Sequence, residues 1–303
     1  MKVTSFEQLL KTVRGKPKRT VALAMAHDPD ALAAVAHANK EGIADAVLVG
    51  PRRKIVECSE KHEIDISAFD IMNANTEIQA VSRSIQLVRE QLADSLMKGA
   101  CSSATLLRGV LDKERGVRAG RLLSHVAVFE VPRYPKLLIM SDGGMNILPD
   151  MDAKLSIIEN AVQAAHRLGV RNPKVALLAA LEKVNYSAMP CTVDAAVISK
   201  MYQRGQIKDA IIDGPLALDN AVSHRACEVK GIVSEVGGDA DILIVPNIET
   251  GNVLYKALAY LGDARVAGII LGAKVPIILT SRADTQEAKF YSIAFGMQIS
   301  GKS

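Results

Sequence analysis

The feature that most constrains the fold of this chain is a repeated alternation of short apolar runs with helix-forming segments. The apolar run TVALAMA at 20–26 is followed by Asp28-Pro29, which is typical of an N-cap with proline at the first helical position. An alanine-rich helix should then extend to Gly42, and ADAVLVG at 44–50 supplies the next strand. Continuous apolar strands joined through a helix predict a β-α-β unit whose parallel sheet is covered on both faces.

The same alternation continues to the end of the chain, and it predicts an α/β fold of two doubly wound domains with mainly parallel strands. Further helices are expected at about 52–62, 76–92, from 103, 152–169 with Asp152 as its cap, 192–204, 217–229, 250–261 and 284–299. Further strands are expected at about 67–72, 94–97, 124–131, 137–141, 174–180, 209–213, 241–245, 265–271 and 275–279.

Length and composition narrow the class of protein. A chain of 303 residues suggests two domains, and the rhythm restarts after Ser141 at a Gly-Gly turn, which indicates a rigid junction. The formal charge of +4 is small and the basic residues are scattered, which argues against a nucleic-acid partner. The four cysteines stand far apart without a Cys/His cluster, so no metal site or disulfide framework is expected. Without a signal peptide or a membrane-length apolar run, we expect a cytoplasmic protein with no membrane contact.

Polar clusters follow several of the predicted strands, at the sheet edge where open α/β folds bind their ligands. Several are turns rich in Gly, Ser, Thr and Asn, which suit phosphate because they present backbone N–H groups. None has the spacing of a Walker A loop or of a dinucleotide-binding fingerprint. The clusters are 98–108, 141–146, Asn185, 213–219, 246–252 and 281–284.

The last cluster, Ser281, Arg282 and Asp284, lies where the final strand turns into the final helix. A helix N-terminus presents unpaired N–H groups and the positive end of its dipole, which together favour an anion. The same residues would also serve an ordinary capped helix start, with a solvated arginine and a favourable first-turn acid. Local signals leave both interpretations open.

Several blocks in order resemble the phosphate acyltransferases, and most closely their butyryl branch. They are LMKGACSSATLLRGVL, LLSHVAVFEVP, SDGGMNILPD, DGPLALDNAVS, GDADILIVPNIETGNVLYKAL and IILTSRAD, and the resemblance extends from about residue 20 to 300. It implies a fold like that of isocitrate and isopropylmalate dehydrogenases with the active cleft between domains. The C-terminal helix then returns to the first domain, so that the domains are 1–140 plus 280–303, and 141–279.

The reaction that the resemblance implies is acyl-CoA plus phosphate giving acyl phosphate plus CoA, usually in a homodimer. Coenzyme A is then a substrate, and neither a metal nor a permanently bound cofactor nor a covalent acyl-enzyme is implied. Such a transfer needs a base for the thiol proton, donors for the oxyanion on the acyl carbonyl, and cations for the phosphate.

The resemblance gives catalytic roles to the turn at 281–284. Arg282 can hold phosphate in a bidentate fork and Ser281 can donate to the oxyanion, as the matching Ser-Arg pair does in the acetyl relatives. Those relatives place an acid seven residues beyond the serine, where this chain has Ala288. Asp284 is the favoured replacement, although a helix N-terminus lowers the pKa of a carboxyl group. Glu287 is the alternative base, and the thiol could also ionise in a positive field without one.

A second anion site is expected at Ser102, Ser103, Thr105 and Arg108, where Arg108 matches an arginine of the family. The same residues could simply cap a helix. Neighbouring Cys101 has no His or Asp partner in any motif, which favours a packed thiol over a nucleophile.

Four further residues are candidates for lining the cleft or binding substrate phosphate: Asn252, Lys256, Asp142 and Asn146. Asn252 and Lys256 share a helix face, although Lys256 could be a solvated lysine. Asp142 could instead fix the Gly-Gly turn.

Three other functions stay open. The first is acetyl specificity within the same family, since many Leu, Ile and Met residues could form the acyl pocket. The second is a metal- and NAD-dependent decarboxylating dehydrogenase on the same fold, although its aspartate blocks are not recognisable here. The third is a relative that binds CoA or acyl phosphate without catalysis, which the alanine at position 288 keeps possible.

Overall fold

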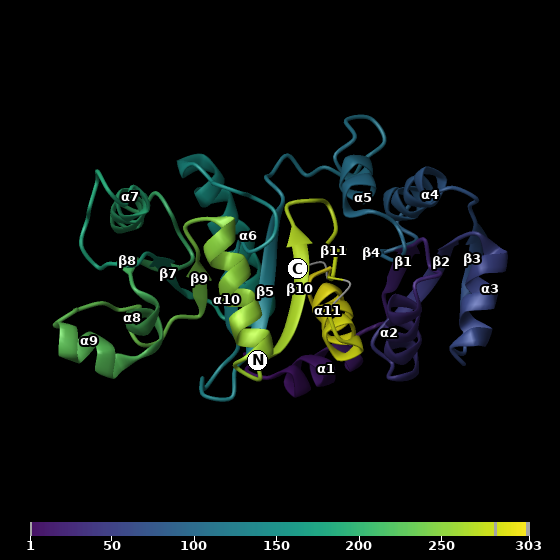
Figure 1. Cartoon of the computed structure of the whole chain (residues 1–303), viewed down its shortest axis with the longest axis horizontal. Coiled ribbons are helices and arrows are strands. Elements are labelled where there is room, and N and C mark those ends of the chain that lie inside the picture. Colours follow the sequence, from purple (N-terminus) through teal and green to yellow (C-terminus); the bar gives the residue numbers. More distant parts are fainter. Residues whose placement is uncertain (1, 282–283, 301–303) are drawn as a thin grey trace. The chain divides into compact units, whose positions relative to one another are not determined.

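The computed structural model describes residues 2–281 and 284–300, and it confirms the α/β class. The described helices are α1 (Phe6–Arg14), α2 (Pro29–Lys40), α3 (Arg52–Lys61), α4 (Glu77–Arg89), α5 (Ser103–Val110), α6 (Met151–Arg167), α7 (Cys191–Gln203), α8 (Leu218–Val222), α9 (His224–Lys230), α10 (Ile248–Tyr260) and α11 (Gln286–Ile299). The described strands are β1 (Thr20–Ala24), β2 (Asp45–Gly50), β3 (Asp70–Asn73), β4 (Ser95–Lys98), β5 (Ser124–Glu130), β6 (Leu138–Ser141), β7 (Lys174–Leu178), β8 (Ile211–Leu216), β9 (Ile242–Ile244), β10 (Arg265–Leu271) and β11 (Ile277–Ile278). Figure 1 shows their course.

The chain divides into two compact units, each of which is discontinuous in sequence. Unit 1 contains the described residues up to Ser5 together with Leu122–Val266, and unit 2 contains Phe6–Arg121 and the described residues from Ala267 onward. The return of the C-terminal helix to the N-terminal half agrees with the expected connectivity. The edges of these units differ from the predicted domain boundaries near 140 and 280, and the domain assignment itself stays a prediction.

Unit 2 is a doubly wound sheet. Its strands follow the order β3-β2-β1-β4-β11-β10, and the pairs from β3 to β11 are parallel, whereas β10 runs antiparallel to β11. Helices α1, α2, α3 and α11 lie on one face, and α4 and α5 pack together on the other (Figure 1). Both faces are therefore buried, and β1 and β2 contain the continuous apolar runs that such strands require.

Unit 1 has the strand order β5-β6-β9-β7-β8. Strands β6, β9, β7 and β8 pair in parallel, and β5 pairs antiparallel with β6. Helix α6 packs on β5, β6 and β9, while α7 packs on β8 and α8 on β7. The antiparallel pairs in both units are additions to the parallel alternation that the sequence predicted, since two strands in direct succession reverse direction without a crossover helix.

Local capping explains where most helices begin. Asp28 caps α2 with Pro29 at its first position, as predicted. The prediction that Asp152 caps the long sixth helix is wrong, because Asp150 is the residue whose carboxylate accepts the N–H of Ala153. The last helix begins at Gln286 under a Thr285 cap, two residues later than expected.

One predicted helix is two helices. The segment expected at 217–229 breaks at Ser223, whose extended backbone ends α8 and whose hydroxyl caps α9. Helix α1 was not among the predicted helices, and it buries Phe6, Leu9 and Val13. None of the described helices combines the length and apolar character that crossing a membrane requires.

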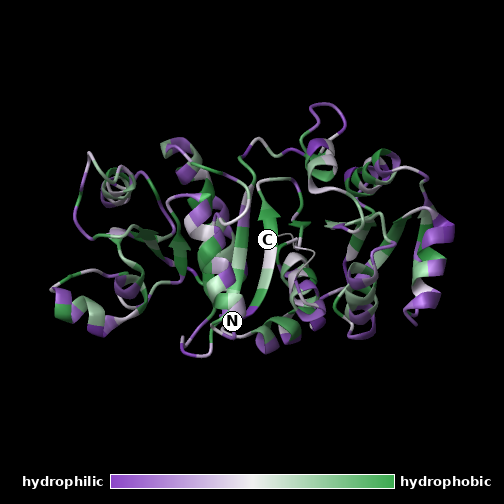
Figure 2. Ribbon diagram, viewed as in Figure 1, coloured by the Kyte–Doolittle hydropathy of each residue, from purple (hydrophilic) through white to green (hydrophobic). Residues whose placement is uncertain are grey.

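Figure 2 shows apolar residues along the strands and on the inner sides of the helices. Helix α11 is exceptional because twelve of its fourteen residues, Ala288–Ile299, are buried. Its Phe290 and Tyr291 stack on His37 of α2 and Phe6 of α1. A helix that is covered on all sides has a fixed place in the core of unit 2.

An ion-pair network lies in unit 1 ahead of β6, β7 and β9. The Lys136 ammonium is 2.8 Å from both Asp239 and Asp241, and Lys174 is 2.8 Å from Asp239. Burial alone would raise the pKa of Asp239, but the hydrogen bonds and charges of Lys136 and Lys174 outweigh it and lower that pKa to about 2.

This pKa predicts how stability depends on pH. A carboxyl group whose pKa falls on folding stabilises the protein above the unfolded pKa, and that contribution is lost as pH falls from about 4 to about 2. We expect Asp239→Asn to lower the urea midpoint at pH 7. The difference from wild type should shrink towards pH 2.5, as measured by circular dichroism. A constant difference over that range would contradict the assignment.

Candidate functional site

Two of the predicted anion-binding clusters belong to neighbouring strands of unit 2. Strands β4 and β11 are parallel partners, with Leu96 opposite Ile277 and Met97 opposite Ile278. The segments that follow them, the turn from Lys98 to Ser102 and the turn at Thr280 and Ser281, therefore leave the same sheet edge side by side. The sequence placed these clusters more than 170 residues apart, and the sheet brings them together.

The turn after β11 is held by Asp284. One oxygen of its carboxylate accepts the backbone N–H of Ser281 at 2.7 Å, and its own N–H donates to the Ser281 carbonyl at 3.2 Å. Asp284 thus fixes the turn, a role that the sequence did not assign to it. Arg282 lies outside the described residues.

Glu287, the alternative base, lies in the first turn of α11. Its carboxylate accepts the hydroxyl of Tyr291 at 2.9 Å, one helical turn further along. Neighbouring Ala288 is buried and its N–H is capped by Thr285. The carboxylates of Asp284 and Glu287 therefore each accept a hydrogen bond. Their positions leave both as candidates for the base that takes the thiol proton.

Lys289 is a residue that sequence reasoning missed. Its side chain is 4% exposed, and its ammonium donates to the backbone carbonyl of Asp284 at 2.6 Å. The Asp30 carboxylate of α2 is 3.7 Å away. From sequence alone, a lysine at the start of a helix is expected to be exposed to solvent. Only the packing of α11 shows that Lys289 is buried.

The turn after β4 begins α5 as predicted, and the serine at its start is a cap. The Ser102 hydroxyl accepts the Thr105 N–H at 3.0 Å and lies 2.9 Å from the Thr105 hydroxyl. Gly99 allows this turn to pass closely over the end of β1, because a side chain there would lie 2.3 Å from the Met25 carbonyl oxygen.

A second residue missed from sequence, Glu77 of α4, reaches this turn. Its carboxylate accepts the Ser102 N–H at 2.8 Å, and the hydrogen bonds from the Ser102 backbone and the Thr105 hydroxyl lower the pKa of Glu77. An internal carboxylate thus occupies part of the anion site that was predicted at Ser102 and Thr105. The first-turn N–H groups of Ser103 and Ala104 are the donors that an α-helix leaves for other partners.

Arg108 is exposed in the last turn of the same helix. Six residues separate it from Ser102, which is about 9 Å along a helix axis, and side chains of a helix point back towards its N-terminus. Arg108 can thus approach the first turn only with an extended side chain. Gly109 beside it lets α5 pack closely on α4, since a Cβ there would meet Val81 at 2.7 Å.

Cys101 is a packed thiol, as favoured from the sequence. It is fully buried, and burial raises its pKa to about 11, while the charge of Lys98 acts in the opposite direction. A thiol with this pKa stays protonated at neutral pH and is a poor nucleophile.

In unit 1, Asp142 is the anchor of the loop after β6. It is 2% exposed, and its carboxylate accepts the N–H groups of Gly144 and Met145 at 2.9 Å and the side-chain amide of Asn146 at 2.6 Å. The same amide donates to the Leu123 carbonyl at 2.9 Å. The structure therefore supports the interpretation that Asp142 fixes the turn, and Asn146 takes part in the same network.

The structure brings this loop against the start of α10, so that the 141–146 and 246–252 clusters meet within unit 1. Gly251 has no room for a side chain, since a Cβ would lie 2.8 Å from both the Asp142 carbonyl oxygen and the Gly143 Cα. Asn252 and Lys256 follow on α10, both exposed, and the Lys256 ammonium lies 6.0 Å from the centre of the Tyr260 ring.

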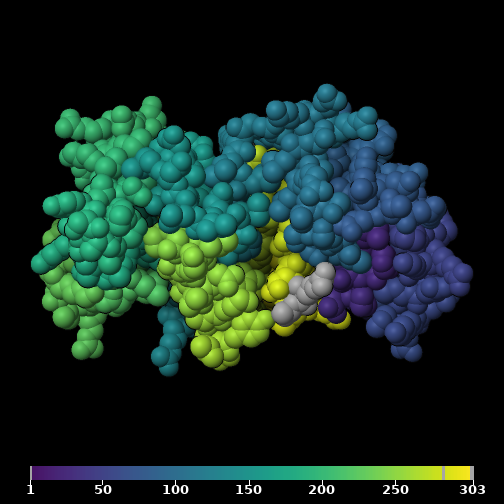
Figure 3. Space-filling model, turned by 45° about the horizontal axis from the view of Figure 1, so that its top comes forward, coloured from purple at the N-terminus to yellow at the C-terminus, as the bar shows by residue number. Residues whose placement is uncertain are grey.

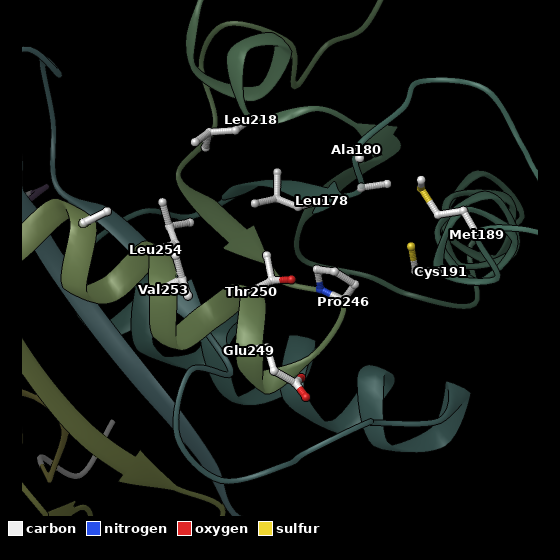
Figure 4. A pocket seen from close by; sticks show the side chains of 12 residues that line it. Leu178, Ala180, Met189, Cys191, Leu218, Pro246, Glu249, Thr250, Val253 and Leu254 are labelled. Atoms are coloured by element: carbon white, nitrogen blue, oxygen red, sulfur yellow. The ribbon is translucent and has the colours of Figure 1, made fainter.

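A pocket of about 700 Å³ opens beside α10 at the carboxyl ends of β7 and β9. Figure 4 shows Thr250, Val253 and Leu254 of α10 lining it from one side. Its lining is mainly apolar: Leu178, Ala179, Ala180, Met189, Cys191, Leu218, Pro246, Glu249, Thr250, Val253, Leu254 and Ala257. The sequence did not predict this pocket, because its lining comes from four separate segments.

Among residues 2–281 and 284–300, no three His, Cys, Asp or Glu side chains are grouped so that they could hold a metal ion.

Comparison with solved structures shows the fold. The chain superposes on a branched-chain phosphotransacylase from Enterococcus faecalis V583 with a TM-score of 0.83 and 35% identity, covering 93% of this chain and 99% of that one. A 4-hydroxythreonine-4-phosphate dehydrogenase from Klebsiella pneumoniae matches with a TM-score of 0.59 and 12% identity, covering 94% and 100%. The second match concerns the fold alone, and it agrees with the dehydrogenase-like architecture that was expected.

Comparison of sequences shows the family. The chain is 46% identical to a phosphate butyryltransferase of Clostridium acetobutylicum over 299 residues, 99% of both chains. It is 45% identical to a phosphate acetyltransferase of Thermotoga maritima over 289 residues, 95% of this chain and 97% of the relative. The family described as "Phosphate acetyl/butaryl transferase" matches residues 5–85 and 78–297. This chain therefore belongs to the phosphate acetyl/butyryltransferase family of enzymes.

Proposed function

We infer that the protein transfers a short-chain acyl group between coenzyme A and inorganic phosphate. In one direction the thiol loses its proton, the sulfur bonds to the acyl carbon, and the bond from that carbon to the phosphate oxygen breaks. The proton leaves with the phosphate or to solvent. We propose that the attack is direct, within a complex that holds both substrates, so that no acyl-enzyme forms.

The observation that best supports this reaction is the adjacency of the β4 and β11 strand ends in unit 2. It gathers two helix N-termini, those of α5 and α11, at one edge of the sheet, where an acyl phosphate and its departing phosphate need positive ends and N–H donors. We propose that Arg282 and Arg108 bind the phosphate and that Ser281 donates to the oxyanion. Ser103 would add a first-turn N–H to the phosphate.

Side chains that already hold the two turns through hydrogen bonds have indirect roles in this proposal. Ser102 and Thr105 hold the α5 turn and Asp284 holds the 281–284 turn, so each would act mainly by placing its neighbours. Glu287 is then the better remaining candidate for the base. Lys256 and Asn252 of α10 are exposed and suit the phosphates of CoA, while Asp142 and Asn146 shape the loop beside them.

We propose a preference for butyryl-sized groups, which the butyryltransferase relative supports and the similarly close acetyltransferase relative leaves to experiment. Acetyl-, propionyl- and butyryl-CoA should each be supplied with phosphate while thiol release is followed. The highest kcat/KM is expected with butyryl-CoA. The preference is wrong if acetyl-CoA is the best substrate, and a protein that binds CoA without phosphate-dependent release would be a non-catalytic relative.

We also propose that the protein is a homodimer. Of the thirteen residues of α10, Gly251 alone is buried, and Val253, Tyr260 and Leu261 are 68%, 59% and 85% exposed. Figure 3 shows α10 in yellow-green on the surface of unit 1. An antiparallel pairing of two α10 helices across a two-fold axis would bury the exposed apolar residues Val253 and Leu261 of both copies.

The dimer can be tested at Val253, an exposed apolar residue of α10. Val253→Asp is expected to convert the protein to a monomer in light scattering, because burying an unpaired carboxylate costs more than the valine contributed, about 2 kcal/mol. Val233→Asp, at a fully exposed valine away from α10, is the control and should leave the mass unchanged. If Val253→Asp keeps its mass but raises the KM for acyl-CoA, the pocket beside α10 serves the substrate instead.

The cytoplasmic location and the absence of a nucleic-acid partner stay predictions from the sequence.

A further inference from the structure

The buried cation of unit 2, Lys289, is not explained by the roles assigned so far. Its ammonium donates to a neutral carbonyl, that of Asp284, at 2.6 Å. The carboxylate nearest to it in the described chain, Asp30, is 3.7 Å away, beyond hydrogen-bond distance, and that side chain is 49% exposed. Lysine is rarely buried without a close partner, because removing its charge from water is costly.

A second buried lysine shows the usual arrangement. Lys154 of α6 is 7% exposed and makes a direct charged hydrogen bond with Asp194 of α7. Its charge is therefore neutralised where it lies. Lys289 has a similar burial, but its ion-pair partner Asp30 is 3.7 Å away and makes no direct hydrogen bond with it. It also lies at the N-terminal end of α11, where the helix dipole is positive.

We propose that Lys289 is a positioning residue for acyl transfer: it ties α11 to the backbone of Asp284 and places a fixed positive charge beside that carbonyl. The inference rests on the proposed function. Its position is informative, because Lys289 directly follows Ala288, where the acetyl relatives are expected to have their acid. A base accepts the thiol proton, whereas a nearby cation lowers the pKa of the thiol, and both raise the fraction that reacts.

The charge would act on both partners of the reaction. The thiol must ionise before its sulfur bonds to the acyl carbon, and the phosphate gains charge as its oxygen leaves that carbon. A buried cation acts on these anions through a medium that screens it less than water does. It also needs no proton transfer of its own, so it works in either direction of the reaction.

Other charged groups face α11 and set the background field. On α2, Asp30 is close and His37 stacks on Phe290. Glu287 of α11 accepts from Tyr291. Lys16 and Arg19 bond to Gln298 and Met297 at the far end of the helix. Asp30 is thus the nearby carboxylate that opposes Lys289, which makes it the natural second site for a test.

The test compares Lys289→Met, Lys289→Arg and Asp30→Asn with wild type and with Lys154→Met as the matched control. The rate of butyryl phosphate with CoA is measured from pH 6 to 9.5. Lys289→Met is expected to lower kcat about tenfold and to move the rising limb of the profile up by about one pH unit. Lys289→Arg should return the rising limb to its wild-type pH. Asp30→Asn should move the rising limb to lower pH. Lys154→Met should lower the melting temperature and leave the limb in place.

The opposite outcomes overturn the proposal. If Lys289→Met keeps the wild-type limb and loses only stability, Lys289 is structural. If Lys289→Met does not fold, the Asp30→Asn variant decides. A rising limb of its pH profile that stays in place or moves to higher pH would also show that Lys289 is structural. An inactive wild type would defeat the proposed function instead. Calorimetry with inorganic phosphate would then still test the charge, since Lys289→Met should weaken phosphate binding about fivefold and equal binding would refute the role.

Discussion

Replacing Arg282 by alanine is expected to lower kcat/KM for phosphate by about a thousandfold, because a guanidinium fork is the strongest phosphate ligand that a side chain offers. The loss should appear in kcat as well as in the KM for phosphate, since the guanidinium both binds the phosphate and directs its attacking oxygen at the acyl carbon. Arg282→Lys should recover about tenfold of the loss, because a lysine keeps the charge without the fork. Phosphate-dependent release of CoA measures all of these effects.

The control for this substitution is Arg53→Ala on α3, an exposed arginine that pairs with Glu57. It should stay within about twofold of wild type, as expected for a surface pair. Melting temperatures of both variants should be unchanged. Retention of more than a tenth of the wild-type kcat/KM in Arg282→Ala would refute the phosphate role and strengthen Arg108 as the principal ligand. Asp284→Asn and Glu287→Gln complete the set, and a loss confined to Glu287→Gln would identify it as the base.

Replacing Asp142 by alanine should strongly destabilise unit 1. The substitution removes the acceptor of four hydrogen bonds in a buried loop and leaves the N–H groups of Gly144, Met145 and Asn146 without it. Unsatisfied buried donors cost about 1–3 kcal/mol each, partly relieved by entering water, so a loss of about 3–4 kcal/mol in the free energy of unfolding is expected.

Urea denaturation followed by circular dichroism measures this loss. Asp152→Asn is the matched control, since Asp152 is exposed in the first turn of α6, and it should cost less than about 1 kcal/mol. Asp142→Asn should fall between the two, because its amide keeps one acceptor but turns a donor towards Asn146. A cost below 1 kcal/mol for Asp142→Ala would show that the loop is held by other contacts.

The α/β class, the α2 cap at Asp28 and most strands followed from the sequence because they depend on local patterns. A buried parallel strand needs a continuous apolar run, and a helix start needs a short polar cap, and both are visible within a few residues. The start of helix α6 was predicted wrongly because two nearby aspartates could each cap it. Asp150 and Asp152 are equally suitable in sequence, and only the backbone conformation of Asp150 decides between them.

The candidate site likewise contains residues that the sequence predicted and residues that only the structure shows. The Ser281-Arg282 pair and the Ser102–Arg108 segment were predicted from their residues and from family resemblance, and their roles stay predictions. Glu77 and Lys289 were not, since Glu77 reaches Ser102 across 25 residues of chain and Lys289 becomes buried only when α11 packs against α2. Neither contact has a local signature.

The sequence by itself determined the alternation of strands and helices and the polar turns at the strand ends, because both depend on side-chain chemistry over short spans. The tertiary structure alone decided which turns meet. Strand pairing placed the β4 and β11 ends side by side. Packing of loops and helices made Asp142 and Asp284 turn anchors and buried Lys289 at 3.7 Å from the Asp30 carboxylate. Such contacts depend on strand order and helix packing, which are set by the free energy of the whole unit and not by any one segment.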